Sequence, residues 1–411
     1  MKDDSFFPNK TDLTSAINVL FDDLSNATPL PLPSILPDSG LGEQTTIEGL
    51  APLVLGKAAK LGSEHAFAHM DPPTPWITWV SALWNASCNQ NMLHPDLSPV
   101  ASECEQTLLQ WLSPLYGMDG GHMTPGSTVS NLTALWAARE LTSARKVYAS
   151  DASHLSIAKS AHILGLEYHS LPTDDSGAIL HSSMPDDVSD AILVLTAGTT
   201  SAGAIDCLRS QYNAAWTHVD AAWAGPLMLS QKYSHLLSGI EQADSVSISA
   251  HKWFFQPKES ALILFKNNAL ASKAISFGGA YLASPNIGVL GSRSANAIPL
   301  LATFLAWGKQ GMAARIDATM ELIESLQSRL QQRNEVSMYQ PNSTGVILWR
   351  VENNAKTLSV FEQLPQGAAS TTNIDECLWI RQVGANPNVN IDKLWKKIER
   401  VLDDILSNTD S

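Results

Sequence analysis

The chain has 411 residues, enough for a large domain with a smaller one attached, and its 44% hydrophobic and 16% charged residues are typical of a soluble globular protein. The formal net charge of −14 argues against nucleic acid or an anionic membrane surface as a partner. No apolar run reaches the roughly 18 residues of a membrane span and the start lacks the features of a signal peptide, so we expect a cytoplasmic protein.

Residues 1–55 are predicted to form a helix and an arm. The helical pattern consists of Leu13, Ile17, Leu20, Phe21 and Leu24, and prolines follow at positions 29, 31, 33 and 37. A helix followed by an extended segment fits this pattern. The segment either lies on a partner subunit or forms a disordered tail.

A large domain is predicted over residues 56–305. It opens with a proline-rich loop, His69–Pro75, and an amphipathic segment that contains Trp76, Trp79 and Trp84. Core packing is the simplest role for these tryptophans. Thr74 in the loop and Asn91 beyond the tryptophans are candidates for binding a substrate at a pocket mouth.

The next informative stretch is Gly126, Ser127 and Thr128, which opens a predicted helix. The free N–H groups and positive dipole of a helix start bind anions, and the two hydroxyl groups can donate to a phosphate. The alternative is ordinary capping, because Ser and Thr begin many helices that bind no phosphate.

Two further polar segments follow predicted strands. His154 comes after the strand Lys146–Ala149, and its flat ring either stacks on a cofactor or serves in capping and packing. The strand Ala191–Thr196 runs into a glycine-containing loop with Thr199 and Thr200. Ligands of open α/β sheets bind at these carboxyl ends of strands.

The most informative residues are Asp220 and Lys252. A short strand delivers Asp220, and the small Ala222 after it leaves room for a flat ring. A second strand, which ends near Ser249, stops at Lys252 between a histidine and a tryptophan. Burial lowers the pKa of a lysine, and a neutral amine can form a Schiff base with a carbonyl cofactor.

Taken singly, Asp220 is explained by a helix cap and Lys252 by a strand end that points to solvent. Together they form the arrangement that pyridoxal phosphate needs, since the carboxylate holds the pyridine nitrogen protonated and makes the ring an electron sink.

The four cysteines, Cys88, Cys104, Cys207 and Cys377, contain no CxxC pair, so neither a disulfide framework nor a zinc or other metal site is expected.

These motifs resemble a known family. Ser153–Lys159, Gly198–Thr200 with Gly203–Asp206, His218–Trp223 and Ser249–Trp253 occur in the order and spacing of the pyridoxal-phosphate-dependent group II amino acid decarboxylases. That family includes the glutamate, aspartate, diaminobutyrate, aromatic amino acid and histidine decarboxylases. The resemblance implies the aspartate aminotransferase fold (fold type I), with a large, mainly parallel α/β sheet domain, a small C-terminal α/β domain and a homodimer whose site lies at the subunit interface.

The resemblance also implies roles for individual residues. Lys252 would bind the cofactor as a Schiff base, which the amino acid substrate then displaces. Asp220 would pair with the pyridine nitrogen. The ring would lie between His154 on one face and Ala222 on the other. The phosphate would be held by Ser127, Thr128 and His251, and Gly126 and Ser249 would also bind the cofactor. The ring hydroxyl would meet Thr199 or Thr200, and Arg381 would receive the substrate carboxylate. Arg381 is suited to this role because a guanidinium binds a carboxylate through two hydrogen bonds; the alternative is an arginine that faces solvent.

A small C-terminal domain is predicted over residues 306–411. It contains a long helix over Ala313–Gln332, strands at Gly345–Trp349 and around Ile380, and a closing helix over Ile391–Leu406.

The sequence departs from the family pattern in two places. The loop before Ser127 has one glycine where many relatives have two, and the segment Tyr281–Arg293 is short where aromatic amino acid decarboxylases carry a longer loop with a proton-donating tyrosine. The proton donor is therefore unassigned.

The leading hypothesis is a decarboxylase that releases carbon dioxide and a primary amine. The run His251–Pro257 looks most like the aspartate, glutamate and diaminobutyrate branch, which favours a small polar or acidic substrate. A carbon–carbon lyase, an aminotransferase and a non-catalytic binding relative are the alternatives.

Overall fold

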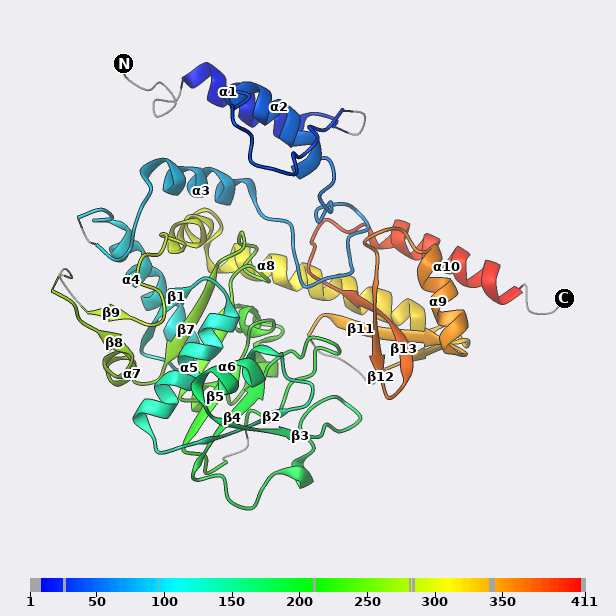
Figure 1. Ribbon diagram of the computed structural model, residues 1–411. Coiled ribbons are helices and arrows are strands. Elements are labelled where there is room, and N and C mark those ends of the chain that lie inside the picture. The colour runs from blue at the N-terminus through cyan, green and yellow to red at the C-terminus, as the bar shows by residue number, and fades with distance from the viewer. Residues whose placement is uncertain are drawn as a thin grey trace. The chain divides into compact units, whose positions relative to one another are not determined.

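The computed structural model describes residues 9–24, 27–94, 96–209, 212–280, 282, 285–339 and 344–407 (Figure 1). Tyr281 lies outside these residues. Contacts divide the chain into two units, Met1–Lys60 and Leu61–Ser411. No helix within the described ranges has the length and apolar character needed to cross a membrane.

The described residues of the first unit form the helices α1 (Lys10–Asn18), which continues into a 3-10 turn at Val19–Phe21, and α2 (Glu43–Val54). The side chain of Asn9 caps α1 by accepting the N–H of Thr11 at 2.8 Å. The α-helix ends at Asn18, before the last residues of the predicted apolar pattern, Leu20, Phe21 and Leu24. Helix α2 was not predicted. The proline-containing segment between them forms no helix or strand, but the Leu30 N–H donates to the Gly49 carbonyl of α2 at 2.8 Å.

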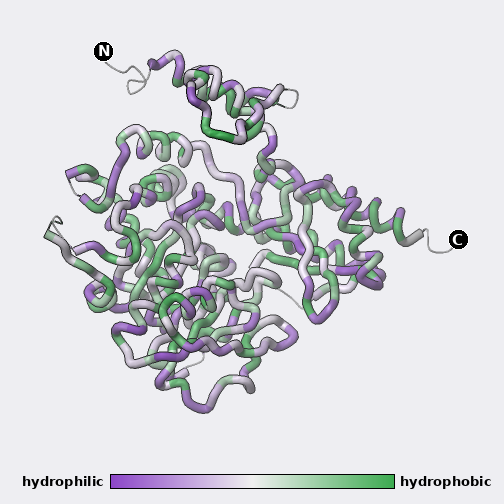
Figure 2. The backbone as a smooth tube through the Cα atoms, in the orientation of Figure 1, coloured by the Kyte–Doolittle hydropathy of each residue, from purple (hydrophilic) through white to green (hydrophobic). Residues whose placement is uncertain are grey.

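The second unit is built on a seven-stranded sheet with the order β1-β7-β6-β5-β4-β2-β3. Only β7 among these strands runs antiparallel to its neighbours. The strands are β1 (Gly120–Thr124), β2 (Lys146–Ser150), β3 (Glu167–Leu171), β4 (Ala191–Thr196), β5 (Trp216–Asp220), β6 (Ser245–Ser249) and β7 (Ala261–Phe265). Strands β4 and β7 are nearly continuous apolar runs because both faces of the sheet are covered, and they are green in Figure 2.

A smaller, antiparallel sheet follows toward the C-terminus, with the order β10-β11-β13-β12. Its strands are β10 (Val336–Met338), β11 (Val346–Val351), β12 (Ser370–Ile374) and β13 (Cys377–Val383), accompanied by α9 (Asn354–Gln363) and α10 (Ile391–Ser407). The predicted fold class, a large and mainly parallel sheet with a small C-terminal α/β part, is confirmed.

The remaining elements surround the large sheet. The α-helices are α3 (Trp76–Cys88), α4 (Ala101–Leu112), α5 (Ser127–Leu141), α6 (Ser156–Leu164) and α7 (Asn268–Ala274). Short 3-10 turns occur at Ser113–Tyr116, His181–Ser183, Gly225–Leu229, Ser234–Leu237 and Ile240–Gln242, and β8 (Ser276–Phe277) pairs with β9 (Asn286–Ile287).

The long helix α8 (Ala297–Gln331) connects the two sheets. It is interrupted at Gly308, whose φ of 65° and ψ of 177° are not helical, so the predicted helix over Ala313–Gln332 corresponds only to the part after this kink. Ile316 packs in the core of the large sheet, whereas Leu326 packs in the core of the small one. The predicted domain boundary at residue 306 falls inside α8, whose buried residues belong to the large-sheet core up to Met320 and to the small-sheet core from Ile323, so this boundary stays a prediction.

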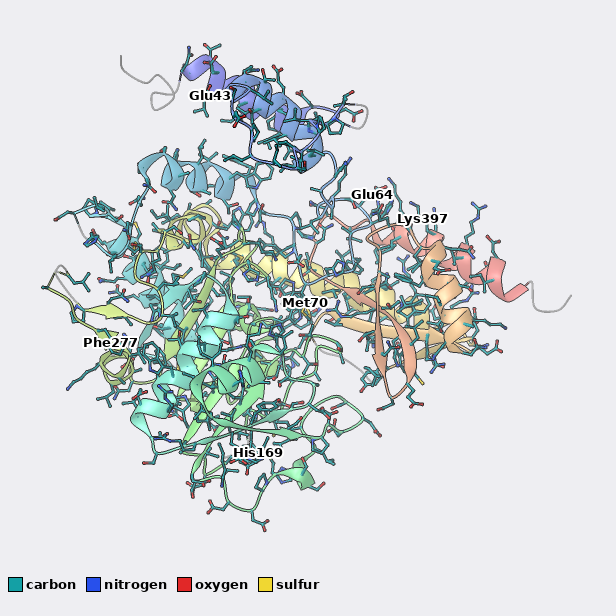
Figure 3. All side chains as sticks on the ribbon, viewed as in Figure 1. Glu43, Glu64, Met70, His169, Phe277 and Lys397 are labelled. Carbon is teal, nitrogen blue, oxygen red and sulfur yellow. The ribbon has the colours of Figure 1, made fainter. Side chains whose placement is uncertain are left out.

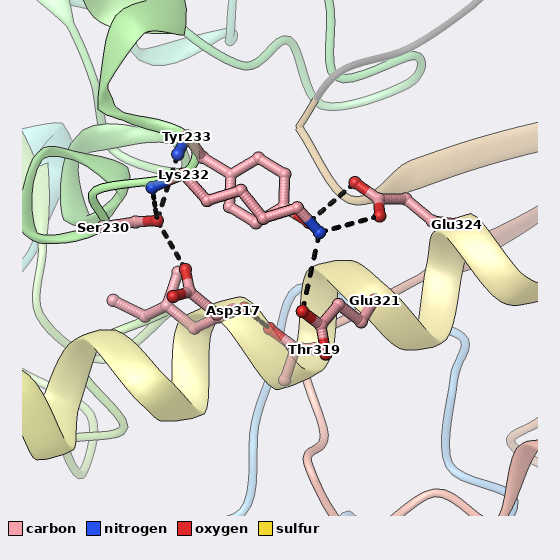
Figure 4. A network of polar contacts seen from close by, with 8 residues as sticks. Ser230, Lys232, Tyr233, Asp317, Thr319, Glu321 and Glu324 are labelled. Atoms are coloured by element: carbon pink, nitrogen blue, oxygen red, sulfur yellow. Dashed lines mark hydrogen bonds and ion pairs between the residues drawn. The ribbon is translucent and has the colours of Figure 1, made fainter.

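Polar contacts also attach α8 to the large sheet (Figure 4). Asp317 of α8 accepts a hydrogen bond from the Ser230 hydroxyl at 2.5 Å, and Glu324 accepts one from Tyr233 at 2.7 Å. Lys232 lies near Glu321 and Glu324, at 3.5 and 3.2 Å. The segment after the 3-10 turn at Gly225–Leu229 is therefore tied to α8.

The loop before α3 joins the two cores. Phe67 is buried in the core of the small sheet, and Met70, labelled in Figure 3, is buried in the core of the large one. The backbone of Phe67 accepts the N–H of Val383 at 2.7 Å. The loop thus passes directly between the sheets, where it can contribute to a site.

The tryptophans of α3 do not pack in the core, and that expectation is wrong. Trp76 and Trp84 are 68% and 61% exposed, and Trp79 is 46% exposed. The buried residues of α3 are the smaller Thr78 and Ser81. The helix packs against α8, and small side chains allow such close approach.

Candidate active site

The candidate residues gather where β4, β5 and β6 end. These strands are parallel neighbours, with Thr196 opposite Asp220 and Asp220 opposite Ser247, so their carboxyl ends lie at one edge of the sheet. Lys252 lies in the turn after β6, where its N–H donates to the Ser249 carbonyl at 3.2 Å. The structure therefore brings Asp220 and Lys252 to the same edge, although they lie on different strands.

Lys252 is only partly accessible to solvent. Burial lowers the pKa of Lys252, and the charges of Lys258 and Arg381 lower it further, whereas those of Asp220 and Asp71 oppose the shift. A lowered pKa favours the neutral amine, the form that attacks a carbonyl.

Asp220 is 4% exposed, and each of its carboxylate oxygens accepts a hydrogen bond. One carboxylate oxygen accepts the N–H of Ala222 at 3.1 Å and faces the Ser247 hydroxyl at 3.3 Å. The other accepts from Asn131 Nδ2 at 2.8 Å. These donors hold the carboxylate in one orientation at the end of β5.

His154 lies in the loop after β2, directly before α6. Its Nδ1 is 2.8 Å from the Ser156 hydroxyl and 3.2 Å from the Ser156 backbone nitrogen. Burial lowers the pKa of His154, and Lys252 and Lys159 also lower it, whereas Asp220 raises it. The side chain is held by the first residue of α6 and feels the charges of both Asp220 and Lys252.

The predicted phosphate-binding residues come from three segments. Gly126 precedes α5 and Ser127 begins it, and the Ser127 hydroxyl lies 2.5 Å from the hydroxyl of Ser249 at the end of β6. No atom lies within 4 Å of a Cβ built at Gly126, so the helix start borders open space. Thr128 is exposed. A helix start with two converging hydroxyl groups suits an anion.

His251 follows Ser249 by two residues, and its imidazole is already engaged. Nδ1 donates to the Ser260 carbonyl at 3.1 Å, which leaves Nε2 as the second ring position. Burial lowers the pKa of His251 to about 4, with smaller effects from Lys258 and Lys252. A phosphate dianion near Nε2 would favour the protonated ring and oppose this shift.

Arg381 on β13 joins three segments. Its Nε donates to the carbonyls of Thr200 and Ser201 at 3.1 and 3.2 Å, and Nη1 donates to the Ala68 carbonyl at 3.0 Å. The side chain is buried, which lowers the pKa of Arg381 to about 10, against the opposing charge of Asp71. Arg381 therefore faces inward and not toward solvent.

The two threonines after β4 differ in their surroundings. Thr199 is buried, and its hydroxyl accepts the Ala204 N–H at 2.9 Å, which closes the loop on itself. Thr200 is exposed and offers its backbone carbonyl to Arg381.

Thr74 and Asn91 make other contacts. The Thr74 hydroxyl accepts from the indole of Trp79 at 2.7 Å, and Asn91 Nδ2 donates to the Ser292 hydroxyl at 3.2 Å. Neither contact connects to Lys252, Asp220 or Arg381, so their role in substrate binding stays a prediction.

Sequence reasoning missed several residues of this region. Asn131, His218 and Ser247 form a buried hydrogen-bond network behind Asp220. Asp71, in the loop after Phe67, pairs with Lys258 and influences the pKa values of Lys252 and Arg381. Their positions in the sequence could have indicated these residues. Asn131 lies one helical turn after Ser127, and His218 lies two residues before Asp220 on the same strand.

These residues fit pyridoxal phosphate. An amine with a lowered pKa, a fixed carboxylate, an imidazole and an anion-binding helix start are the donor set that its aldehyde, pyridine nitrogen, ring and phosphate require. With the seven-stranded sheet order, they define a pyridoxal-phosphate enzyme of fold type I.

Comparison with known proteins identifies the family. The model of the pyridoxal-dependent decarboxylase conserved domain matches residues 31–352, and the chain belongs to this family of carboxy-lyases. The chain is 29% identical to L-2,4-diaminobutyrate decarboxylase of Rhizobium meliloti, over 90% of this chain and 83% of that one. It is 24% identical to an aromatic-L-amino-acid decarboxylase of Bacillus atrophaeus, over 87% and 85%.

Solved structures agree on the fold. The glutamate decarboxylase domain of a diaminobutyrate-pyruvate transaminase and L-2,4-diaminobutyrate decarboxylase from Vibrio parahaemolyticus superimposes with a TM-score of 0.80 at 21% identity, covering 96% of this chain and 94% of that one. The predicted family, enzyme class and cofactor are thereby confirmed.

Proposed function

We propose that this chain decarboxylates an L-amino acid with a small polar or acidic side chain and releases carbon dioxide and the primary amine. The observation that carries this proposal is the convergence of Lys252, Asp220 and His154 at one sheet edge in a chain of the decarboxylase family. The preference for a short polar substrate rests on the run His251–Pro257 and on the diaminobutyrate decarboxylases among the relatives.

In this proposal Lys252 holds the cofactor through its amine, and Asp220 supports the pyridine nitrogen. His154 and Ala222 lie on the two faces of the ring. The phosphate is held by Gly126, Ser127, Thr128, Ser249 and His251, and Thr199 or Thr200 approaches the ring hydroxyl. The bound cofactor supplies an electron sink for the bond that breaks.

The protein's own residues orient the substrate. Arg381 is buried, and its Nε and Nη1 are held by backbone carbonyls, so the guanidinium has a fixed direction. A fixed guanidinium can bind the substrate carboxylate at low entropic cost. Asp71 lies near enough to influence Arg381 and Lys252, and it places a negative charge at this side of the site.

The proposal includes a cytoplasmic homodimer. Large apolar side chains on α3, namely Trp76, Trp79 and Trp84, are exposed within the single chain, and such patches mark association surfaces. The thiols of Cys88, Cys104 and Cys377 form no disulfides, which suits a reducing compartment. Sedimentation of the purified protein tests the dimer.

The direct test of the reaction is carbon dioxide release by the protein loaded with pyridoxal phosphate, against a panel of L-amino acids, with the amines identified by mass spectrometry. Release from one short polar or acidic amino acid is the expected result. Release only from aromatic amino acids would contradict the substrate proposal. A change in the cofactor's visible absorption without carbon dioxide release would instead favour a carbon–carbon lyase or an aminotransferase.

A further inference from the structure

A buried chain of hydrogen bonds runs behind the proposed cofactor site and reaches both Asp220 and His154. Its centre is Asn131 of α5, a fully buried amide. Nδ2 of this amide donates to Asp220 Oδ2 at 2.8 Å and to the Ser156 hydroxyl at 2.9 Å. One amide group therefore contacts Asp220 directly and His154 through Ser156.

The orientation of the Asn131 amide follows from chemistry. An ionised carboxylate only accepts hydrogen bonds, so the Asn131 NH₂ group and not its oxygen must face Asp220. The oxygen then faces the opposite way, where it accepts from the Ser247 hydroxyl at 2.6 Å and lies 3.0 Å from His218 Nε2. Since an amide oxygen cannot donate, His218 must carry its proton on Nε2.

The far end of the chain agrees with this direction. His218 Nδ1 lies 2.9 Å from the Ser245 hydroxyl, which also accepts from the indole N–H of Trp216 at 2.9 Å. An indole only donates, so Ser245 is free to give its own hydrogen to His218 Nδ1. The hydrogen bonds from Trp216 through Ser245, His218 and Asn131 to Asp220 therefore all run in one direction.

The branch toward His154 is directed in the same way. Ser156 accepts from Asn131, and its hydroxyl hydrogen can go to His154 Nδ1 at 2.8 Å. The backbone N–H of Ser156 also points at this nitrogen, at 3.2 Å. The backbone N–H can only donate, so a proton on Nδ1 would point at another hydrogen, and the neutral ring carries its proton on Nε2.

We propose that Asn131 and Ser156 are positioning residues that keep His154 neutral with its proton on Nε2. The side of His154 that is not bound to Ser156 then presents an N–H donor to cofactor or substrate, and not a lone pair. Asn131 gives the same amide group to Asp220, so the carboxylate and the imidazole are oriented by one side chain. The functional meaning of this tautomer rests on the proposed function, whereas the tautomer itself does not.

The charges around His154 are consistent with a neutral ring. Lys252 and Lys159 disfavour the protonated imidazole, and burial has the largest effect in that direction. Asp220 is the opposing charge, but its carboxylate accepts hydrogen bonds from Asn131 and the Ala222 N–H. The ring therefore gains little from a second proton.

The test is nitrogen NMR of the imidazole rings in the full chain labelled with ¹⁵N-histidine, recorded with and without pyridoxal phosphate between pH 5 and 8. The His154 signals are assigned from their absence in His154→Gln. We expect the shift of an unprotonated Nδ1 and a protonated Nε2, with no titration near the ordinary imidazole pKa of about 6.5. A proton on Nδ1 in the unmodified protein would overturn the proposal without any need for a variant.

The variant Ser156→Ala removes the hydroxyl donor, and Ser156→Thr restores it. Ser160→Ala is the matched control, because Ser160 is equally buried in α6 and takes no part in this chain of hydrogen bonds. We expect mixed tautomers and a higher His154 pKa in Ser156→Ala only, with recovery in Ser156→Thr. An unchanged His154 spectrum in Ser156→Ala would refute the role of Ser156.

Kinetics then separates this inference from the proposed function. Loss of one hydrogen bond changes a rate by about tenfold, so we expect kcat of Ser156→Ala to fall about tenfold. Ser156→Thr should recover kcat, because it keeps the hydroxyl group. If the spectra shift as expected but no amino acid is decarboxylated by the unmodified protein, the tautomer assignment stands and the proposed function fails.

Discussion

The indole rings of Trp223 and Trp253 stack with their centroids 3.9 Å apart and their planes 24° from parallel. Trp223 follows Asp220 by three residues, and Trp253 follows Lys252 directly. Their N–H groups donate to the carbonyls of Thr344 at 2.7 Å and Gly384 at 2.8 Å, next to the strands of the small sheet. The stacked pair therefore fixes the two strand ends that carry the proposed site against each other and against the C-terminal part.

Replacement of Trp253 by alanine should lower the free energy of unfolding by about 3–5 kcal/mol, the usual cost of removing a fully buried large aromatic side chain. Urea denaturation of the purified variant measures this. Leu358→Ala, at a position 42% exposed on α9, is the control and should change stability by less than about 0.5 kcal/mol. Equal losses in both variants would show that the stacked pair has no special role.

Parts of this arrangement could be predicted from the sequence and parts could not. β4 was predictable because buried parallel strands are apolar and are followed by polar loops, whereas β5 was located by its end at Asp220 before small residues. Asn131 could not be assigned a role, because its partners depend on how closely α5 approaches β5 and β6. The exposure of Trp76 was missed for the same reason, since local pattern does not reveal which face meets α8.

Lys252→Ala should abolish the visible absorption of bound pyridoxal phosphate and reduce decarboxylation by at least about 10³-fold, because no other group replaces its amine. Absorption spectroscopy and carbon dioxide release measure the two effects. Lys266→Ala is the control, because Lys266 follows β7 and its ammonium donates to the Glu241 carbonyl. A Lys252→Ala protein that keeps the band would refute the assignment.

The ion pair between Glu105 and Arg293 connects α4 to the segment before α8. Both guanidinium Nη atoms contact the carboxylate, at 2.7 and 2.8 Å, and Glu105 is 4% exposed. Arg293→Met should cost about 3–5 kcal/mol of unfolding free energy because it leaves a buried charge without a partner.

The double variant Glu105→Gln, Arg293→Met should lose less than the single Arg293→Met variant, since no unpaired charge remains. Arg400→Met, which breaks an exposed pair with Asp404 on α10, should cost less than about 1 kcal/mol. Urea midpoints of these variants form the comparison, and a double variant worse than the single one would contradict the ion-pair explanation.

Asp206 should make stability depend on pH. Burial raises the pKa of Asp206 from 3.8 to about 6, although its oxygens accept the N–H groups of Thr196 and Ile179. Because the folded pKa is higher than the unfolded one, the folded state binds the proton more tightly. The resulting stabilisation is complete below about pH 4 and is lost as the pH rises through 6, by about 3 kcal/mol.

Comparison with Asp206→Asn isolates this effect, since the variant cannot titrate at this position. The free energy of unfolding of the unmodified protein minus that of the variant should fall between pH 4 and 7 and then level off. Parallel pH profiles for the two proteins would show that Asp206 keeps an ordinary pKa in the folded state.

Arg381→Lys should raise KM for the amino acid at least about tenfold, because an ammonium keeps the charge but cannot reproduce the planar donors that contact Ala68, Thr200 and Ser201. Arg381→Ala should raise KM further, with kcat less affected if the guanidinium mainly binds the carboxylate. Arg350→Ala, on the neighbouring strand β11 and stacked on Trp379, serves as the control. If Arg381→Lys and Arg350→Ala leave KM equally unchanged, Arg381 only joins the three segments of backbone and takes no part in substrate binding.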